Sequence, residues 1–247
     1  PGLINGHDHF EMNLFPRLGK PPYSNSQEWA LDIHATYPSL IKTLQKVPVE
    51  TRLEWSAIKN IISGASVAVH HDLYRRHFNK KAFPIKVLKN YTWAHSIYMD
   101  KKIDRTFIKN GYPFIFHAAE GIDEETFLEI DKLDAMGVLN ENTVIVHGIA
   151  LSVAQINKLS NKNVSLIWCP SSNSFLFHRT APISEIKNKI RIGLGTDSTL
   201  TGLPTLWEEM RFACESGLAT PHEIFEMVSS TAADIFKLRN YSHRINN

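Results

Sequence analysis

The chain has 247 residues, of which 43% are hydrophobic, and this is enough to bury one large core. Lysine and arginine total 27 against 25 acidic residues, so the near-neutral charge gives no basis for nucleic acid or an anionic membrane as a partner. No apolar run is long enough to cross a bilayer, and no signal-peptide pattern opens the chain. The only two cysteines, Cys169 and Cys214, cannot form a disulfide framework, which favours a reducing compartment such as the cytoplasm.

Short apolar β runs alternate with amphipathic helical segments along the chain. The chain starts at Pro1 without a methionine, and we expect a fragment or a processed product. The predicted strands cover residues 2–5, 65–69, 84–91, 113–116, 143–146, 164–168 and 190–194. An eighth strand is either poorly marked between residues 93 and 110 or missing. The alternation predicts a parallel sheet and an α/β, TIM-like (β/α)8 barrel with one unit short or distorted. We expect one barrel domain over residues 1–238 and a tail over 239–247.

Three helices are marked by apolar spacing and capping signals. The first covers residues 50–62 and is expected to bury one apolar face, formed by Leu53, Ile58, Ile61 and Ile62. The second covers residues 124–136, with Asp123 as its N-cap, Gly137 as its end, and Phe127, Ile130 and Leu133 facing inward. A third begins after Ser152, which forms a capping box with Gln155.

Histidine and aspartate follow the predicted strands repeatedly. These residues are His7 and His9, His117, His147 and Asp197. Residues two apart in a strand point to the same face, so His7 and His9 can both face the mouth of a barrel, where active sites lie. Any one strand-end histidine is more often a hydrogen-bonded packing residue than a ligand. Four strands that each end in His or Asp favour a metal centre, and imidazole with carboxylate suits zinc or iron.

Glu120 lies three residues after His117, within reach of the space beside such a metal. A carboxylate at that point can move protons between water and a leaving nitrogen. The alternative is an acidic residue that stabilises the start of the next helix, and position alone does not decide between the two roles.

Other polar residues are weaker candidates for the site. Trp93 and His95, read as the end of the third strand, are our best candidates for substrate contacts. Asn173, with Ser171 and Ser172, either binds substrate or builds a turn. The segment His70-His71-Asp72 either lines the pocket or is structural. Cys169 is expected to be a buried small residue rather than a nucleophile.

Four segments together resemble the ordered signatures of the amidohydrolase superfamily, and most closely its cytosine deaminase, guanine deaminase and triazine hydrolase-like branch. They are Pro1-Gly2-Leu3-Ile4-Asn5-Gly6-His7-Asp8-His9, His117-Ala118-Ala119-Glu120, Val146-His147-Gly148 and Gly195-Thr196-Asp197-Ser198. Cys169-Pro170-Ser171-Ser172-Asn173 resembles the strand-seven turn of that branch, and Ser230-Thr231-Ala232-Ala233 its final barrel helix. The resemblance therefore extends from Pro1 to about Leu238.

The resemblance implies a role for each matching residue. His7, His9, His117 and Asp197 would hold the metal, and Asp197 would also accept a proton from the attacking water. Glu120 would be the proton shuttle. His147 would hydrogen-bond the activated water or the substrate.

The chain departs from that branch in three ways. We expect a barrel without the β-sandwich segments that usually flank it, and with short third and fourth units. No lysine is well placed to become the carboxylated bridge of two-metal relatives, because Lys86 and Lys89 are better read as surface residues. This favours a single metal ion.

The resemblance implies hydrolytic deamination of a small heterocycle by a metal-activated water, with zinc favoured over iron. A cyclic amide, ester or halide hydrolase with the same metal site is the first alternative. A catalytically silent barrel that serves as a binding module is the second. We expect a small-molecule substrate and no nucleic-acid or membrane partner, and a homo-oligomer stays open.

Overall fold

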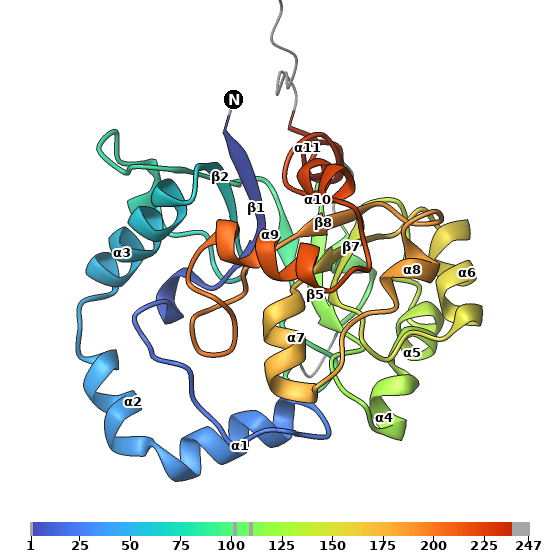
Figure 1. The fold of residues 1–247 in the computed structure, drawn as a ribbon, viewed down its shortest axis with the longest axis horizontal. Coiled ribbons are helices and arrows are strands. Elements are labelled where there is room, and N and C mark those ends of the chain that lie inside the picture. The colour runs from blue at the N-terminus through green and yellow to red at the C-terminus, as the bar shows by residue number, and fades with distance from the viewer. Residues whose placement is uncertain (1, 101–102, 109–110, 239–247) are drawn as a thin grey trace, which may run out of the picture.

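The chain forms an α/β structure with two parallel sheets, seen in a computed structural model that describes residues 2–100, 103–108 and 111–238 (Figure 1). The first sheet contains β1 (Leu3–Asp8), β2 (Ala65–His70) and β3 (Lys86–Val87), in that order. The second contains β4 (Thr92–Trp93), β5 (Phe114–Ala118), β6 (Thr143–His147), β7 (Ser165–Trp168) and β8 (Ile192–Leu194). The strands lie in chain order and pair in parallel, so their carboxyl ends share one side of the molecule.

The last strand of the second sheet leads back to the first strand of the first. The amide N–H of Asp197, just after β8, donates to the carbonyl of His7 in β1 at 3.1 Å. Gly195 lies at this approach, and a Cβ there would come within 2.6 Å of the His7 Cβ. Only glycine allows the two backbones to lie this close, so the segments that carry His7 and Asp197 are held together.

The prediction of one long strand over residues 84–91 was wrong. The segment contains only β3 (Lys86–Val87), and β4 (Thr92–Trp93) follows four residues later without an intervening helix. β3 pairs with β2, whereas β4 pairs with β5. Trp93 therefore belongs to the fourth strand and His95 follows it, rather than either ending the third strand. These two-residue strands are too short to show a period of two in the sequence.

Helices surround the strands, and the figure shows α1 and α2 as an arc below the first sheet and α4–α6 beside the second (Figure 1). α1–α6 are Ser26–Thr36, Pro38–Gln45, Val49–Ile62, Glu124–Phe127, Glu129–Ala135 and Val153–Asn161. α7–α11 are Pro170–Phe177, Ile183–Ile186, Leu206–Glu215, Pro221–Met227 and Ser230–Ile235. Short 3-10 turns cover Phe10–Met12, Arg76–Asn79 and Arg105–Phe107. The expected tail 239–247 lies outside the described residues.

The predicted helix starts are confirmed. The Asp123 side chain accepts the N–H of Thr126, and Ser152 and Gln155 form a reciprocal capping box at the start of α6. The helix expected over residues 124–136 is divided at Leu128 into α4 and α5. Phe127 is 41% exposed rather than inward, because it lies at the end of α4.

The face that α3 buries is not the one predicted. Ile58, Ile61 and Ile62 are 49%, 42% and 68% exposed, and only Leu53 of the expected set is buried. The inward face also includes Ala57 and three polar residues, Ser56, Lys59 and Asn60. These polar groups are buried because they meet side chains that extend from β1 and the turn after it, as described below.

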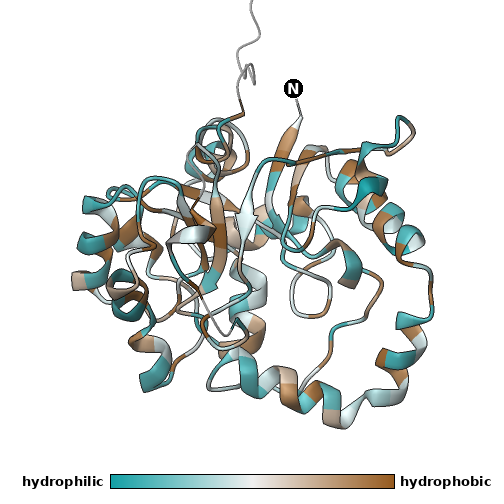
Figure 2. Ribbon diagram, turned by 180° about the vertical axis from the view of Figure 1, so that it is seen from behind, coloured by the Kyte–Doolittle hydropathy of each residue, from teal (hydrophilic) through white to brown (hydrophobic). Residues whose placement is uncertain are grey.

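Much of the hydrophobic sequence lies in the strands, which carry brown segments in Figure 2. β5 and β6 are buried along their whole length, and Ile115, Ile145 and Ile167 are fully enclosed. Strands that read as continuous apolar runs are typical of parallel sheets covered on both faces. In the described part of the chain, no helix combines the length and apolar character needed to span a membrane.

Candidate active site

Three histidine rings meet at the carboxyl ends of β1 and β5. The Nε2 atom of His117 lies 3.2 Å from Nε2 of His7 and 3.3 Å from Nε2 of His9. The ligand atoms of these three side chains all lie within 4.8 Å of one another. The strand pattern accounts for this, because His7 lies in β1, His9 directly follows that strand, and His117 ends the apolar run of β5.

Asp197 adds a carboxylate to this group. Its Oδ1 atom lies 3.6 Å from Nε2 of His9 and 3.9 Å from Nε2 of His7. Oδ2 accepts hydrogen bonds from the hydroxyls of Ser172 (2.7 Å) and Thr201 (3.0 Å). Burial opposes ionisation, but His9, His147 and these hydroxyls together hold the pKa of the Asp197 carboxyl below its usual value. The lowered pKa favours the carboxylate form of Asp197, which lies beside the imidazoles of His7 and His9.

The tautomer of His117 is determined by His95, which follows β4. Its Nδ1 lies 2.9 Å from the carbonyl oxygen of His95, and a carbonyl can only accept, so Nδ1 carries the proton. Nε2 then presents a lone pair toward His7 and His9. Burial, and then the neighbouring histidines, hold the pKa values of His7 and His117 well below the usual value. Neutral imidazoles and a carboxylate, arranged in this way, fit a borderline divalent cation.

Glu120 and His147 form a second pair beside this centre. Oε1 of Glu120 lies 3.4 Å from Nε2 of His147, and the glutamate side chain is only 12% exposed. Burial raises the pKa of Glu120, against the opposing effect of His147. At this distance the carboxyl group and the imidazole can exchange a proton. Glu120 lies outside the first turn of the next helix, since α4 begins only at Glu124.

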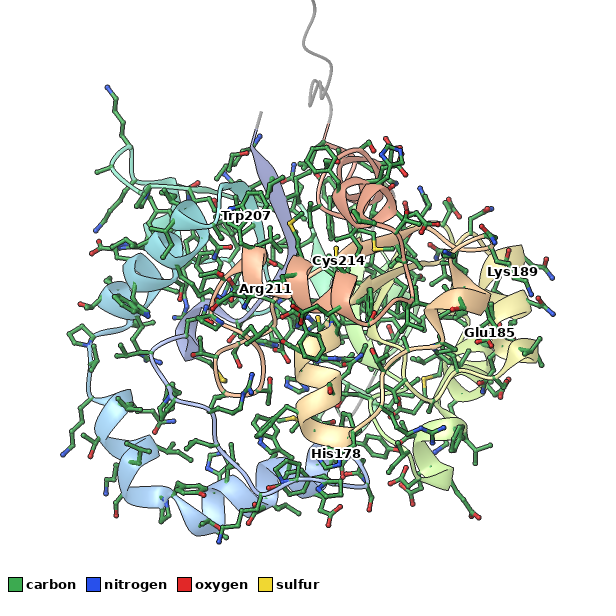
Figure 3. All side chains as sticks on the ribbon, in the orientation of Figure 1. His178, Glu185, Lys189, Trp207, Arg211 and Cys214 are labelled. Atoms are coloured by element: carbon green, nitrogen blue, oxygen red, sulfur yellow. The ribbon has the colours of Figure 1, made fainter. Side chains whose placement is uncertain are left out.

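The first turn of α7 contacts both parts of the site. The Asn173 Oδ1 atom lies 2.8 Å from Nδ1 of His147, and Ser172 donates to Asp197. Ser171 donates its N–H to Glu209 of α9 at 2.8 Å and also bonds it through its hydroxyl. Glu209 is fully buried and faces inward, and burial raises its pKa to about 8. Trp207 and Arg211 on the same helix lie on its outer side (Figure 3).

Three residues at this end of the strands have a left-handed backbone. The φ angles are 53° at Ala119, 77° at His147 and 56° at Asp197. Each costs on the order of 1–3 kcal/mol for a residue other than glycine, and such strain persists only where surrounding contacts impose it. One such contact is clear, because the Ala119 N–H donates to the buried carboxyl of Glu129 at 2.5 Å. The strained residues therefore lie at the end of β6 and in the turns after β5 and β8, and these segments position the side chains of Glu120, His147 and Asp197.

The remaining predicted residues lie around the three histidines. The His71 ring is stacked on that of His117, with 4.2 Å between centroids, and its Nε2 donates to the carbonyl of Ala94. Trp93 packs edge-on against His71, and the His95 ring lies 4.7 Å from that of His117. The Nδ1 atoms of His71 and His95 are buried without a hydrogen-bond partner.

His70 lies apart from this group and packs against Phe10 and Phe78. Its side chain is only 1% exposed, and its Nδ1 accepts the N–H of Phe10. Of the predicted segment 70–72, His71 is therefore the residue whose ring contacts His7, His9 and His117. Lys86 and Lys89 are exposed, as expected.

Sequence reasoning missed several residues that hold the site. Thr201, Glu129 and Glu209 have no strand-end position and no motif that marks them. Ser172 was noted only as part of a turn. For Ser172 the available signal was the run of three polar residues, Ser171 to Asn173, shortly after the buried strand β7.

A model of the amidohydrolase family matches residues 108–246, more than half of the chain. The chain belongs to the amidohydrolase family. The matched region contains His117, Glu120, His147 and Asp197, and the membership confirms the resemblance seen in the sequence.

Named relatives of this amidohydrolase are deaminases. It is 25% identical to a 5'-deoxyadenosine deaminase of Methanosphaera stadtmanae, over 80% of this chain and 57% of that protein. It is 28% identical to a 5-methylthioadenosine/S-adenosylhomocysteine deaminase of Pyrococcus abyssi, over 50% of this chain and 33% of that one. The chain thus spans between a third and three fifths of these relatives' lengths.

Solved structures support the fold. An atrazine chlorohydrolase from Arthrobacter aurescens with bound zinc matches with a TM-score of 0.72 at 12% identity, over 98% of this chain and 72% of that one. A zinc-bound adenosine deaminase from Xanthomonas campestris matches with a TM-score of 0.64 at 14% identity, over 96% of this chain and 67% of that one. At this identity the likeness concerns the fold.

Proposed function

We propose that His7, His9, His117 and Asp197 hold one divalent cation, zinc in preference to iron. The convergence of three imidazole nitrogens and one carboxylate oxygen carries this proposal. The protonated Nδ1 of His117 leaves its Nε2 free to coordinate, as in most histidine ligands. A single cation is proposed because Lys86 and Lys89, the lysines considered as a bridge between two metals, are exposed.

We further propose that the two sheets form the (β/α)8 barrel expected from the sequence, as one domain over residues 1–238. The chain-order arrangement of eight parallel strands supports closure, as does the bond from Asp197 to His7. In such a barrel the carboxyl ends of the strands form the active site, which agrees with the position of every proposed ligand.

The proposed reaction is hydrolytic deamination of a small heterocycle, in which water replaces an amino group and ammonia is released. When bound, the cation would lower the pKa of a water molecule toward neutrality. Asp197 and Glu120 are placed to accept protons from the attacking water. Glu120, whose pKa is raised by burial, then delivers a proton to a ring nitrogen of the substrate. His147 holds its Nε2 toward the same space, and it would stabilise negative charge that develops on the substrate when Nε2 carries a proton in addition to the one on Nδ1.

Trp93 and His95 are proposed as substrate contacts. Both lie at the end of β4 beside His71 and His117, and the His95 ring has an unpaired Nδ1 atom. Asn173 was also predicted to contact substrate, but its oxygen is occupied by His147. We propose that it orients His147 instead. A small molecule is the only partner that this site requires, and a homo-oligomer and a location in the cytoplasm stay predictions.

A halide, cyclic amide or ester hydrolase is the second candidate. The fold similarity to an atrazine chlorohydrolase favours it, because the same ligands and the same acid–base pair can serve either leaving group. The shape of the pocket wall, rather than the ligands, would then select the substrate.

The test combines metal analysis with a substrate panel. We expect one equivalent of zinc or iron per chain and ammonia release from an aminopurine nucleoside, an aminopyrimidine or an aminotriazine. His117→Ala should lose metal and activity together, whereas His222→Ala, an exposed histidine on α10, should lose neither. Stoichiometric metal with chloride or carboxylate release in place of ammonia would favour the second candidate. Absence of bound metal after supplementation would support a silent barrel.

A further inference from the structure

A buried polar cluster lies between α3 and β1, outside the groups that the proposed reaction uses. It consists of Asn5, Asp8, Asn13, Lys59, Asn60 and Thr196, and none of these side chains is more than 5% exposed. Asp8 is the last residue of β1, between His7 and His9 in the chain, and its side chain lies on the opposite face of the strand from His7. Thr196 directly precedes Asp197. The cluster therefore contacts the backbone segments that carry three of the four proposed ligands.

Lys59 lies at the centre of this α3 polar cluster. Its ammonium group lies 3.2 Å from Oδ2 of Asp8, 3.0 Å from Oδ1 of Asn13 and 3.2 Å from the hydroxyl oxygen of Thr196. An ammonium group has three protons, and here each has an acceptor. A buried lysine is costly unless it is paired and hydrogen-bonded in this way, so its position is closely determined by these three groups.

The acceptors of Lys59 are themselves held by amide groups. Asp8 also accepts from Asn13 at 2.6 Å and from Asn60 at 2.7 Å. Asn5 donates to the Thr196 hydroxyl at 2.9 Å and accepts the Thr196 N–H at 3.1 Å. Lys59 and Asn5 thus join the His7-Asp8-His9 segment to the Thr196-Asp197 segment through Thr196, from the side opposite the proposed metal.

We infer that Lys59 is a positioning residue for the metal centre, which it serves by holding Asp8 and Thr196, and so His7, His9 and Asp197, at the spacing that one cation requires. The inference rests on the proposed metal site. Removing one partner of a buried ion pair lowers stability, because the other charge is left unpaired. A purely structural Lys59 would therefore predict a Lys59→Met variant that unfolds more easily but, while folded, binds the metal with unchanged affinity.

The test measures zinc affinity by competition with a chromogenic chelator and records the visible spectrum of the cobalt(II)-loaded protein. Lys59→Met should weaken zinc binding by about 10–100-fold, the range typical of residues that orient ligands, and should change the cobalt spectrum. Thr196→Val removes only the hydroxyl and retains the shape, so it should have the same effects in a smaller degree. Leu159→Ala is the control, because it removes buried volume on α6, away from the ligands.

Coupling between Lys59 and Asp8 provides the second criterion. If Lys59 acts through Asp8, the losses of zinc affinity in Asp8→Asn and Lys59→Met should not add in the double variant. Should Lys59→Met fail to fold, Thr196→Val decides. Wild-type affinity and spectrum in a folded Lys59→Met or Thr196→Val variant would overturn the inference, as would a loss no larger than that of Leu159→Ala. A wild-type chain that binds no metal would instead overturn the proposed function, and the inference with it.

Discussion

Nδ1 of His147 lies 2.8 Å from Oδ1 of Asn173, although the two residues are 26 positions apart. The amide oxygen accepts a hydrogen bond, so the proton of a neutral His147 is held on Nδ1 and Nε2 is left toward Glu120. The Asn173 amide group also donates to Thr180 at 3.4 Å, which fixes its orientation. Asn173 thus determines which nitrogen of His147 faces the site.

Replacing Asn173 should lower turnover without removing metal. Asn173→Leu retains the approximate volume but leaves the buried His147 Nδ1 without an acceptor, a loss worth about 1–3 kcal/mol. Turnover should therefore fall by roughly 10–100-fold. The measurement is kcat together with metal content. Asn157→Leu, an exposed asparagine on α6, is the matched control and should retain full activity. Near-normal turnover in Asn173→Leu would leave Asn173 as a simple helix-start residue.

Replacing Glu120 should separate catalysis from metal binding. Glu120→Gln retains the side-chain volume and the ligands, but an amide cannot accept and deliver a proton. General acid–base groups contribute about 10²–10⁴-fold, so turnover should fall by at least that range. Glu124→Gln is the control, since Glu124 is an exposed acidic residue in the first turn of α4. Equal activity in the two variants would make Glu120 a helix-start acid and would remove the central residue of the proposed mechanism.

The metal-free protein should lose stability in mild acid. Burial lowers the pKa values of His7, His71 and His117 well below 6.5, and that of His95 to about 4. The unfolded chain binds more protons below pH 6.5, so the free energy of unfolding falls as the pH drops from 6.5 toward 4. Each such histidine contributes a slope of about 1.4 kcal/mol per pH unit.

Urea unfolding of the chelator-treated protein across this pH range measures the acid effect. His95→Gln should reduce the slope, whereas His222→Ala, at an exposed site, should leave it unchanged. A free energy of unfolding that does not change between about pH 6.5 and 4 would contradict the burial of neutral imidazoles at this centre.

Ionisation of the buried Glu129 side chain should lower the free energy of unfolding as the pH rises toward about 8. Burial raises its pKa to about 8, although the Ala119 N–H favours the charged form. A group whose pKa is raised on folding contributes stability at pH values below its unfolded pKa, and that stability is lost as the pH rises through the folded value. The contribution of Glu129 to the free energy of unfolding should therefore decline between pH 4.5 and about 8, and below pH 6.5 it opposes the larger effect of the buried histidines.

Glu129→Gln can still accept the Ala119 N–H but does not ionise. It should be more stable than the wild type at about pH 9 and similar to it at about pH 5, as measured by the unfolding midpoint in urea at each pH. The exposed Glu124→Gln variant again serves as the control. A variant that is equally destabilised at both pH values would show that the hydrogen bond to Ala119, rather than the charge, determines the effect.

The sequence alone determined most of the candidate site. His7, His9, His117 and Asp197 could be recognised because each directly follows or ends an apolar strand, and the ends of parallel strands meet at one edge. The residue type and its position at the end of a strand are local properties, so they can be read from the sequence without knowledge of the tertiary contacts. The same holds for the capping box of Ser152 and Gln155, which the structure reproduces.

Only the tertiary structure decided which face of α3 is buried and where the fourth strand lies. The apolar spacing predicts that Ile58 and Ile62 are buried, but both are exposed. Lys59 and Asn60 are buried instead, because they bond to Asp8 and Asn13 on the surface opposite α3. β4 is only two residues long and is defined by its pairing with β5. Both features depend on partners that are distant in the chain, and such partners leave no periodic signal in the segment itself.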